Sequence, residues 1–280
     1  MTELRERMIE DMRLHGLAPT TQKIYLNAVQ NLAKHYKRSP DQLSEEEIRK
    51  FFIYLADEKR LARSTLRGYL FAIKFLYQKT LNRKWSVLNL IRVKRSKKLP
   101  VVLSPEEVQH LLSLVHRPVA RMGLIMMYAC GLRVSEATHL RPGDIDSKRM
   151  VVCVCNGKGG KDRQVPLPQR TLEQLRHYWR KYRPPTWLFP SETGFTPIDS
   201  GSIRRCLKAA LHQSDIKKNV SCHTLRHSYA THLLEKGLDL RVIQALLGHQ
   251  NLKTTFIYVH LTQNTMKAVH RTVDDLMADL

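Results

Sequence analysis

A run of cations between residues 92 and 98 divides the chain into two parts. The segment reads RVKRSKK, with five lysines or arginines in seven residues. So many like charges cannot be buried together, and an extended, solvated linker suits such a run. Helical signals resume soon afterwards, because Ser104 can cap a new helix. The sequence therefore predicts two domains, residues 1–91 and 101–280, joined by a basic linker at 92–100.

The first part consists of segments with helical periodicity. Apolar residues recur at helical spacing in four segments, which are residues 4–12, 24–36, 48–55 and 66–77. Gly16 can end the first helix in the left-handed conformation, and Ser44 with Glu47 forms a capping box before the third helix. Four short amphipathic helices of this kind predict a compact helical bundle.

The second part is predicted to be mainly helical with one small β element. Residues 150–155 are rich in valine, and residues 164–167 can pair with them as a second strand. The turn at 157–163 contains three glycines, which would let its basic tip approach another surface closely. The predicted fold class of the whole chain is therefore mainly α with a small antiparallel β element.

The charge of the chain indicates a polyanionic partner. The formal net charge is +22 over 280 residues, and both parts are basic. Neutralising phosphates releases condensed counterions, so such a chain favours nucleic acid. Charge alone leaves open a ribosome-like RNA binder, a membrane-surface protein or simple solubility. The apolar runs are too short to span a bilayer and no secretory signal is visible, so we expect no membrane partner and a cytoplasmic location.

Metal and cofactor sites are not predicted. The five cysteines fit reduced thiols, and neither Cys153-x-Cys155 nor the neighbours Cys222 and His223 have zinc-site spacing. No acidic cluster suggests Mg²⁺, and no glycine-rich loop suggests a nucleotide. We therefore expect no metal and no cofactor. Any chemistry must rest on cations, histidines and a side-chain nucleophile.

Residues suited to such chemistry occur along the second part. The chain reads Tyr128-Ala-Cys-Gly-Leu-Arg133, Gly157-Lys158-Gly, His223-Thr-Leu-Arg226-His, Leu246-Leu247-Gly248-His249 and Thr254-Thr255-Phe-Ile-Tyr258, in that order. Taken singly, each residue has an ordinary explanation, such as a solvated arginine, a core tyrosine or a histidine after a helix-ending glycine. The order and the context of all of them together carry the interpretation.

This order strongly resembles the tyrosine recombinase (phage integrase) family, and within it the Xer-like and integron-integrase-like members. The resemblance runs from about residue 100 to residue 265. The N-terminal helices resemble the four-helix, SAM-like core-DNA-binding domain of the family. The resemblance implies a mixed α/β catalytic domain after residue 100. It also implies an enzyme that cuts and rejoins DNA strands through a 3′-phosphotyrosine, without ATP.

The resemblance implies a role for each motif residue. Tyr258 would attack the scissile phosphate, and Arg133 and Arg226 would hold its non-bridging oxygens, for which planar guanidinium donors are suited. Lys158 would protonate the departing 5′-oxygen. Glu136, one helical turn after Arg133, is expected to orient that arginine or support the fold rather than transfer a proton.

Two histidines complete the implied catalytic set. His223 would orient the phosphate and assist proton transfer, and His249 would donate a hydrogen bond to the phosphate. The nearby His227, His232 and His260 are expected to be structural or adjacent to DNA.

Other basic side chains are predicted to contact DNA phosphates. They are Lys94, Arg95, Lys97, Lys98, Lys161 and Arg163. Residues 269–280 carry an apolar stripe at helical spacing, which needs a partner. In the resembling family a C-terminal helix often docks into a neighbouring protomer. The resemblance therefore implies a homotetramer on double-stranded DNA with exchange of the C-terminal helix.

Three functions remain as alternatives on the sequence alone. A site-specific recombinase or integrase in the bacterial nucleoid is favoured. A topoisomerase IB-like relaxing enzyme could use the same residues, and a catalytically inert DNA-binding regulator could keep the fold. The complete residue set disfavours the inert protein, and the Xer-like contexts with a separate helical domain disfavour the relaxing enzyme. The target site and the biological role stay open.

Overall fold

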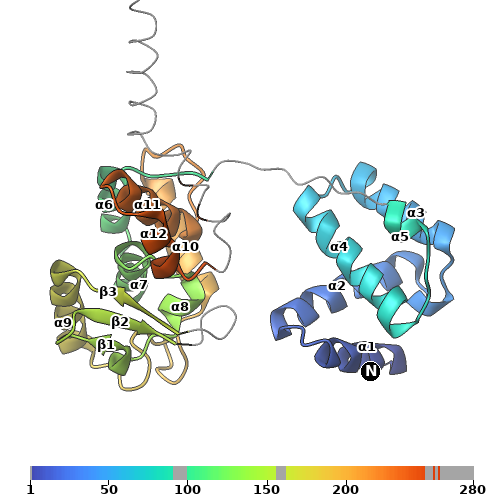
Figure 1. The fold of residues 1–280 in the computed structure, drawn as a ribbon, viewed down its shortest axis with the longest axis horizontal. Coiled ribbons are helices and arrows are strands. Elements are labelled where there is room, and N and C mark those ends of the chain that lie inside the picture. Colours follow the sequence, from blue (N-terminus) through green and yellow to red (C-terminus); the bar gives the residue numbers. More distant parts are fainter. Residues whose placement is uncertain (1, 91–99, 156–161, 250–254, 256–257, 259–280) are drawn as a thin grey trace, which may run out of the picture. The chain divides into compact units, whose positions relative to one another are not determined.

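The computed structural model describes residues 2–90, 100–155, 162–249, 255 and 258. The chain divides into two compact units, Met1–Lys98 and Leu99–Leu280 (Figure 1). Most of the basic linker predicted at 92–100 lies outside the described residues, and so does the C-terminal segment predicted to dock.

All regular secondary structure among the described residues of the first unit is helical. Its elements are α1 (Glu3–Leu14), α2 (Pro19–Tyr36), η1 (Pro40–Gln42), α3 (Glu45–Ile53), η2 (Tyr54–Glu58), α4 (Arg63–Phe75), η3 (Leu76–Thr80) and α5 (Val87–Leu90). The π-helical turns η2 and η3 continue α3 and α4. The four predicted helices are present, and α5 is a short addition. The predicted capping box is present too, because the Ser44 hydroxyl accepts from the Glu47 amide and the Glu47 carboxylate accepts from the Ser44 amide.

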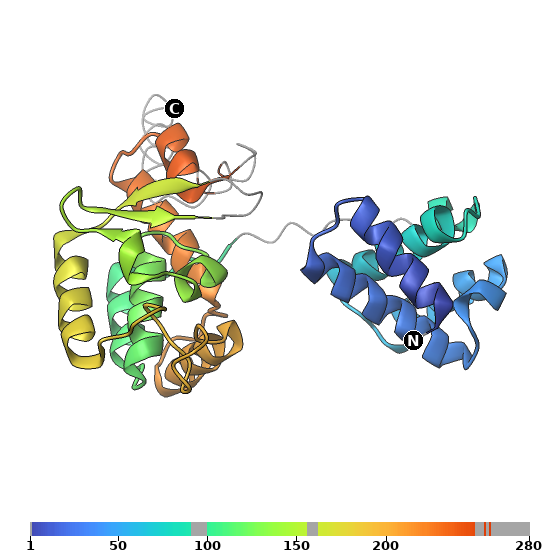
Figure 2. The same ribbon diagram turned by 90° about the horizontal axis from the view of Figure 1, so that it is seen from below.

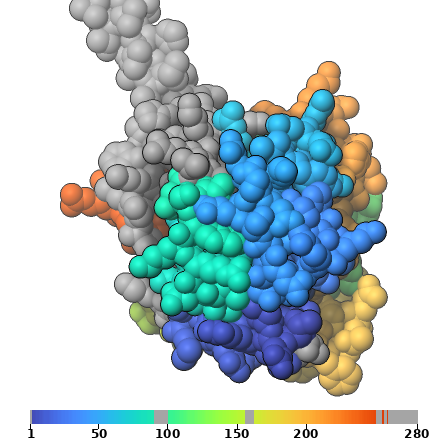
Figure 3. All heavy atoms as spheres, turned by 90° about the vertical axis from the view of Figure 1, so that its right-hand side faces the viewer, coloured from blue at the N-terminus to red at the C-terminus, as the bar shows by residue number. Residues whose placement is uncertain are grey.

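The core of the first unit forms where the apolar faces of its helices meet. Met8 of α1, Leu32 of α2, Ile48 of α3 and Ile73 of α4 are buried together. The Tyr77 hydroxyl in η3 donates a buried hydrogen bond of 2.6 Å to the Pro40 carbonyl, which ties the end of α4 to η1. Figure 3 shows one face of this unit, on which the dark blue residues of α1 and the turquoise residues near the C-terminal end of the unit are both visible.

The second unit is mixed, with helices packed beside a small sheet (Figure 1). Its elements are α6 (Pro105–Ser113), α7 (Pro118–Ala129), α8 (Val134–Thr138), η4 (Pro142–Asp144), β1 (Ile145–Asp146), β2 (Val151–Val154), β3 (Arg163–Pro166), α9 (Gln169–Tyr182), α10 (Ser200–Gln213), α11 (Cys222–Glu235) and α12 (Leu240–Leu247). The predicted hairpin is confirmed as β2 and β3, which pair antiparallel with Val154 opposite Arg163. The edge strand β1 was not predicted, because two residues are too few to show a periodicity.

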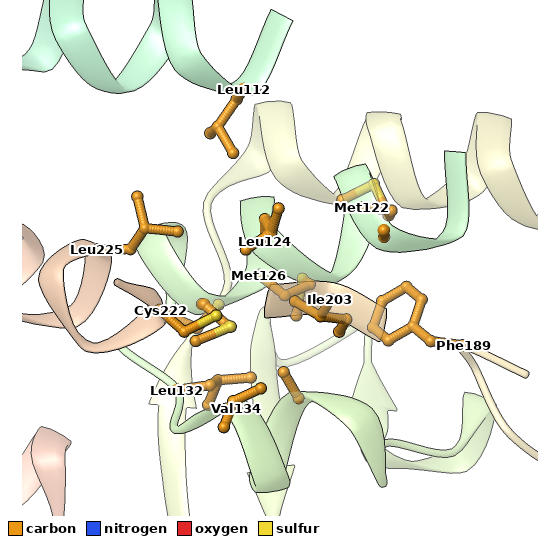
Figure 4. Packing of buried hydrophobic residues seen from close by; sticks show 14 of the residues in the cluster. Leu112, Met122, Leu124, Met126, Leu132, Val134, Phe189, Ile203, Cys222 and Leu225 are labelled. Atoms are coloured by element: carbon orange, nitrogen blue, oxygen red, sulfur yellow. The ribbon is translucent and has the colours of Figure 1, made fainter. Parts of the chain in front are cut away.

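Helix α7 forms the centre of the second unit. Its middle is buried around its circumference, including Met122, Leu124 and Met126, and Figure 2 shows it among the other helices of the unit. Figure 4 shows Met126 close to Ile203 of α10. A Cβ at Gly123 would lie 3.3 Å from the Ile203 side chain, so the glycine allows α10 to approach closely. The mainly α fold with a small antiparallel sheet, predicted from sequence, is confirmed.

No helix within the described residues is both long and apolar enough to cross a membrane.

Candidate active site

Helix α11 presents three site residues on one face. His223, Arg226 and His227 occupy positions i, i+3 and i+4, which lie one above the other on a helix. Ser221 is the N-cap residue of the helix, and its backbone amide donates to the Thr224 hydroxyl at 3.0 Å. Leu225 on the opposite side is fully buried in the core, and this fixes the rotation of the helix about its axis.

Arg226 is buried and connects two distant segments of the second unit. Only 3% of the residue is exposed. Its guanidinium donates to the Gly131 carbonyl at 2.6 Å and to the Leu247 carbonyl. Gly131 lies between α7 and α8, and Leu247 ends α12, so one side chain joins both segments to α11. Burial, with the nearby Arg133 charge, lowers the pKa of Arg226 to about 10, which leaves it cationic at neutral pH.

Glu136 of α8 is surrounded by three arginines. Its carboxylate accepts from Arg133 at 2.5 Å and from both terminal nitrogens of Arg163, at 3.0 and 2.7 Å. Arg226 lies 3.7 Å away. Burial alone would raise the pKa of Glu136, but the hydrogen bonds from Arg163 and Arg133 lower it to about 2. These four side chains therefore hold three positive charges against one negative charge.

Arg163 was predicted to contact a DNA phosphate, and the geometry does not favour that role. Besides the two bonds to Glu136, its Nε donates to the Leu246 carbonyl at 2.8 Å. Its side chain is only 10% exposed. It starts β3, so it connects the base of the hairpin to the arginine cluster and to the end of α12.

His249 directly follows the end of α12. Gly248 ends that helix with a φ of +61°, in the left-handed region that favours glycine. The His249 Nδ1 lies 3.0 Å from the Thr255 hydroxyl. Burial and the charges of Arg226 and Arg133 lower the pKa of His249 to about 4, so the ring is neutral at neutral pH.

Tyr258 lies inside the same cluster and is 1% exposed. It packs with Ala230 of α11 and with Leu247 of α12. Its hydroxyl is 3.0 Å from the Nδ1 of His227, and its ring stacks against His249 at 6.4 Å and 16°. Burial raises the pKa of the Tyr258 hydroxyl, although Arg226 and Arg133 act in the opposite direction.

The structure thus brings together five of the six predicted catalytic residues: Arg133, His223, Arg226, His249 and Tyr258. The sixth, Lys158, lies outside the described residues. So do the predicted phosphate contacts Lys94, Arg95, Lys97, Lys98 and Lys161.

The sequence interpretation missed the contact of His227 with the tyrosine, because it expected His227 to be structural or adjacent to DNA. The available signal was its spacing, four residues after His223 on the same helix face.

Groups that could bind a metal were sought in the described part of the chain. There, no three or more His, Cys, Asp or Glu side chains lie close enough together to hold an ion.

The fold and the site define a class of enzyme. A tyrosine set among arginines and histidines, on a mainly α domain with a small sheet, suits the cutting and rejoining of phosphodiester bonds. Residues 101–265 match the family model of the phage integrase family, and residues 4–87 match that of the phage integrase N-terminal SAM-like domain. The chain belongs to the phage integrase family, as a tyrosine recombinase of the Xer-like kind.

Individual relatives agree with this assignment. A putative integrase/recombinase y4qK of Sinorhizobium fredii is 44% identical over 96% of this chain and 87% of its own length. A tyrosine recombinase XerC of Halalkalibacterium halodurans is 37% identical over 77% of each chain. The Tn1549 transposon integrase in complex with transposon right end DNA shares the fold, with a TM-score of 0.72 at 18% identity, over 98% of this chain and 100% of that one.

The predicted family and the predicted enzyme class, a site-specific DNA strand transferase, are therefore confirmed. A topoisomerase-like function is not favoured by these relatives.

Proposed function

We propose that this chain binds double-stranded DNA and recombines it at a specific site through a 3′-phosphotyrosine at Tyr258. The position of Tyr258 is the main support. Its hydroxyl lies in a buried site where Arg226 and Arg133 act on it electrostatically. A further support is the solved transposon integrase, which is described in complex with DNA.

Arg133 and Arg226 bind the scissile phosphate in this proposal. Three guanidinium groups share the single carboxylate of Glu136, so the cluster has positive charge in excess. A guanidinium has five N–H donors, and Arg226 uses one to Gly131 and one to Leu247. Its remaining donors serve a phosphate that gains charge in the transition state.

The transfer forms one bond and breaks another. The Tyr258 oxygen bonds to phosphorus, and the bond from phosphorus to the 5′-oxygen breaks. Lys158 gives a proton to that departing oxygen. His223 orients the phosphate, and His249, through the ring nitrogen that does not face Thr255, donates a hydrogen bond to it. The energy of the broken bond is kept in the phosphotyrosine, so rejoining needs no cofactor.

Recombination of two sites requires several copies of the enzyme. We propose a homotetramer in which residues 269–280, with their apolar stripe, dock into a neighbouring copy. Because the substrate is DNA, we place the protein in the cytoplasm at the bacterial nucleoid. Lysines and arginines of the linker, with Lys161 of the hairpin, supply further phosphate contacts, which the net charge of +22 favours.

The test begins by finding the DNA site. Full-length protein is incubated with nicked fragments of genomic DNA from its source organism, and DNA that stays bound in detergent is sequenced. A nick near the cleavage site releases a short fragment and traps the adduct. We expect wild-type protein to form the adduct and Tyr258→Phe to form none.

Strand exchange between two copies of the recovered site then separates a recombinase from a relaxing enzyme. If the wild type forms no adduct on any fragment, the catalytic proposal is wrong.

A further inference from the structure

The attack by Tyr258 requires a proton acceptor, and for proton transfer the resemblance implied only assistance from His223. Burial raises the pKa of the Tyr258 hydroxyl, so at neutral pH it carries its proton. That proton must leave as the oxygen bonds to phosphorus. Because the tyrosine is 1% exposed, bulk water does not serve as the acceptor.

His227 is the histidine in contact with this hydroxyl. The distance from its Nδ1 to the Tyr258 oxygen is 3.0 Å, within the range expected of a general base in place. The phenol can donate its hydrogen to Nδ1 when the ring hydrogen of His227 sits on Nε2, and proton uptake at Nδ1 requires this tautomer.

The other two histidines of the site make other contacts. The Nδ1 of His249 lies against the Thr255 hydroxyl at 3.0 Å, and the ring of His249 stacks on the tyrosine ring instead of meeting its hydroxyl. His223 faces the ring of His227, with 6.4 Å between ring centres.

The charges around His227 keep it ready to accept a proton. Its surroundings include His223 and Arg226 on its own helix, with His249 and Tyr258 opposite. Burial, and then the charges of His223 and Arg226, lower the pKa of His227 to about 4, so its ring is neutral. A phosphate anion bound by Arg226 offsets that positive charge. The basicity of His227 therefore rises when substrate is present.

We infer that His227 is a catalytic residue that takes up the Tyr258 proton during attack on the phosphate. As the bond from oxygen to phosphorus forms, the proton moves to Nδ1 and leaves an imidazolium. In the rejoining step the imidazolium returns the proton to the departing Tyr258 oxygen. This inference rests on the proposed function of Tyr258 as the nucleophile.

The main test compares two histidines of α11 whose Nδ1 atoms each lie within hydrogen-bond distance of a tyrosine hydroxyl. His227→Asn keeps a polar atom near the position of Nδ1 but takes up no proton. The control is His232→Asn, because His232 Nδ1 lies 2.9 Å from the Tyr128 hydroxyl. Adduct formation is timed on a nicked duplex that carries the recovered site. We expect His227→Asn to be slower by about a hundredfold with unchanged DNA affinity, and His232→Asn to match the wild type.

A pH series separates proton transfer from simple positioning. Without an internal acceptor, attack depends on the ionised fraction of Tyr258, which grows tenfold per pH unit below its pKa. The rate of His227→Asn should therefore rise about tenfold per pH unit between pH 7 and 9. The wild-type rate should change little over the same range. Removing a residue that only positioned the tyrosine would slow cleavage without creating this slope.

Each outcome decides the inference. If wild-type protein forms the adduct and His227→Asn is as fast, or is slow without the slope, His227 is not the acceptor although the recombinase function stands. His227→Gln, whose amide also accepts a hydrogen bond without taking up a proton, repeats the test if the asparagine variant does not fold. If the wild type forms no adduct, the proposed function itself is wrong.

Discussion

At the scale of single residues, the Glu136 carboxylate stabilises the arginine cluster. Glu136→Gln leaves three guanidinium groups without their shared negative charge. We expect the free energy of unfolding to fall by about 3 kcal/mol, as when one partner of a buried pair is removed. Adduct formation should slow as well, because Arg133 loses the partner that orients it. Denaturant unfolding and timed adduct formation measure the two effects.

A matched control is Glu107→Gln. Glu107 pairs with Lys218 at the surface, and glutamine preserves its capping box with Ser104. Loss of the ion pair with Lys218 should lower the free energy of unfolding by less than about 1 kcal/mol. Equal effects of the two variants would contradict the importance assigned to Glu136.

Arg163 and Lys161 are neighbours in sequence that we expect to act differently. Arg163 is bound to Glu136 and to the Leu246 carbonyl, so Arg163→Met should slow cleavage and leave the salt dependence of DNA affinity unchanged. Lys161→Met removes a predicted phosphate contact and should reduce the salt slope by about one. DNA binding measured over a salt series distinguishes them. A reduced salt slope for Arg163→Met would show that Arg163 does contact a DNA phosphate.

The role of Lys158 can be tested by changing the leaving group of the DNA. Lys158→Ala should keep its DNA affinity, since one phosphate contact among many is lost. Cleavage should slow by about a hundredfold, because the 5′-oxygen leaves without a proton. A bridging sulfur in place of that oxygen is a better leaving group and should restore the rate. If both substrates are slowed equally, Lys158 is not the acid.

At the scale of elements, the turn between α7 and α8 depends on Gly131. Its φ is +60°, and a Cβ there would lie 2.5 Å from the ring of Tyr229. Gly131→Ala should therefore cost about 3 kcal/mol of stability, because strain in the backbone adds to overpacking. It should also displace the carbonyl that Arg226 holds. Chemical denaturation and adduct formation measure both effects.

Gly237 is the control for the backbone contribution alone. Its φ is +87°, and no atom lies within 4 Å of a Cβ placed there. Gly237→Ala should cost only about 1 kcal/mol and leave cleavage unchanged. If both variants lose the same stability, the contact with Tyr229 has no effect.

At the scale of the molecule, the buried histidines predict a loss of stability in acid. The pKa values of His227 and His249 are lowered to about 4, by burial first and then by nearby positive charges. In the unfolded chain a histidine titrates near 6.5. Between those values the unfolded chain binds protons that the folded chain does not. The free energy of unfolding therefore decreases as the pH is lowered from about 6.5 to about 4. Above pH 6.5 the contribution of both residues is constant.

The size of this effect is at most roughly 3 kcal/mol per histidine. Thermal unfolding from pH 7 to pH 5 should show Tm falling, and the fall should be smaller for a double variant with His227→Asn and His249→Asn. A Tm that stays constant over this range, or falls equally in both proteins, would contradict the prediction.

The elements that could be predicted were those whose signal is local. The helices of the first unit follow from apolar periodicity and from the capping box at Ser44, which depend on neighbours a few residues apart. The β2–β3 hairpin follows from two valine-containing segments flanking glycines. The strand β1 and the π-helical turns η2 and η3 are too short to give such a local signal.

The sequence by itself determined the order of the motif residues, the positive charge and the helical patterning, and these identified the family. The tertiary structure decided which of those residues meet. It turned Arg163 inward to Glu136, and it brought His227 to Tyr258. Such contacts join segments far apart in the chain, and they depend on how α11 packs against both α7 and α12. No local rule of spacing encodes that packing, because it results from burying the whole core at once.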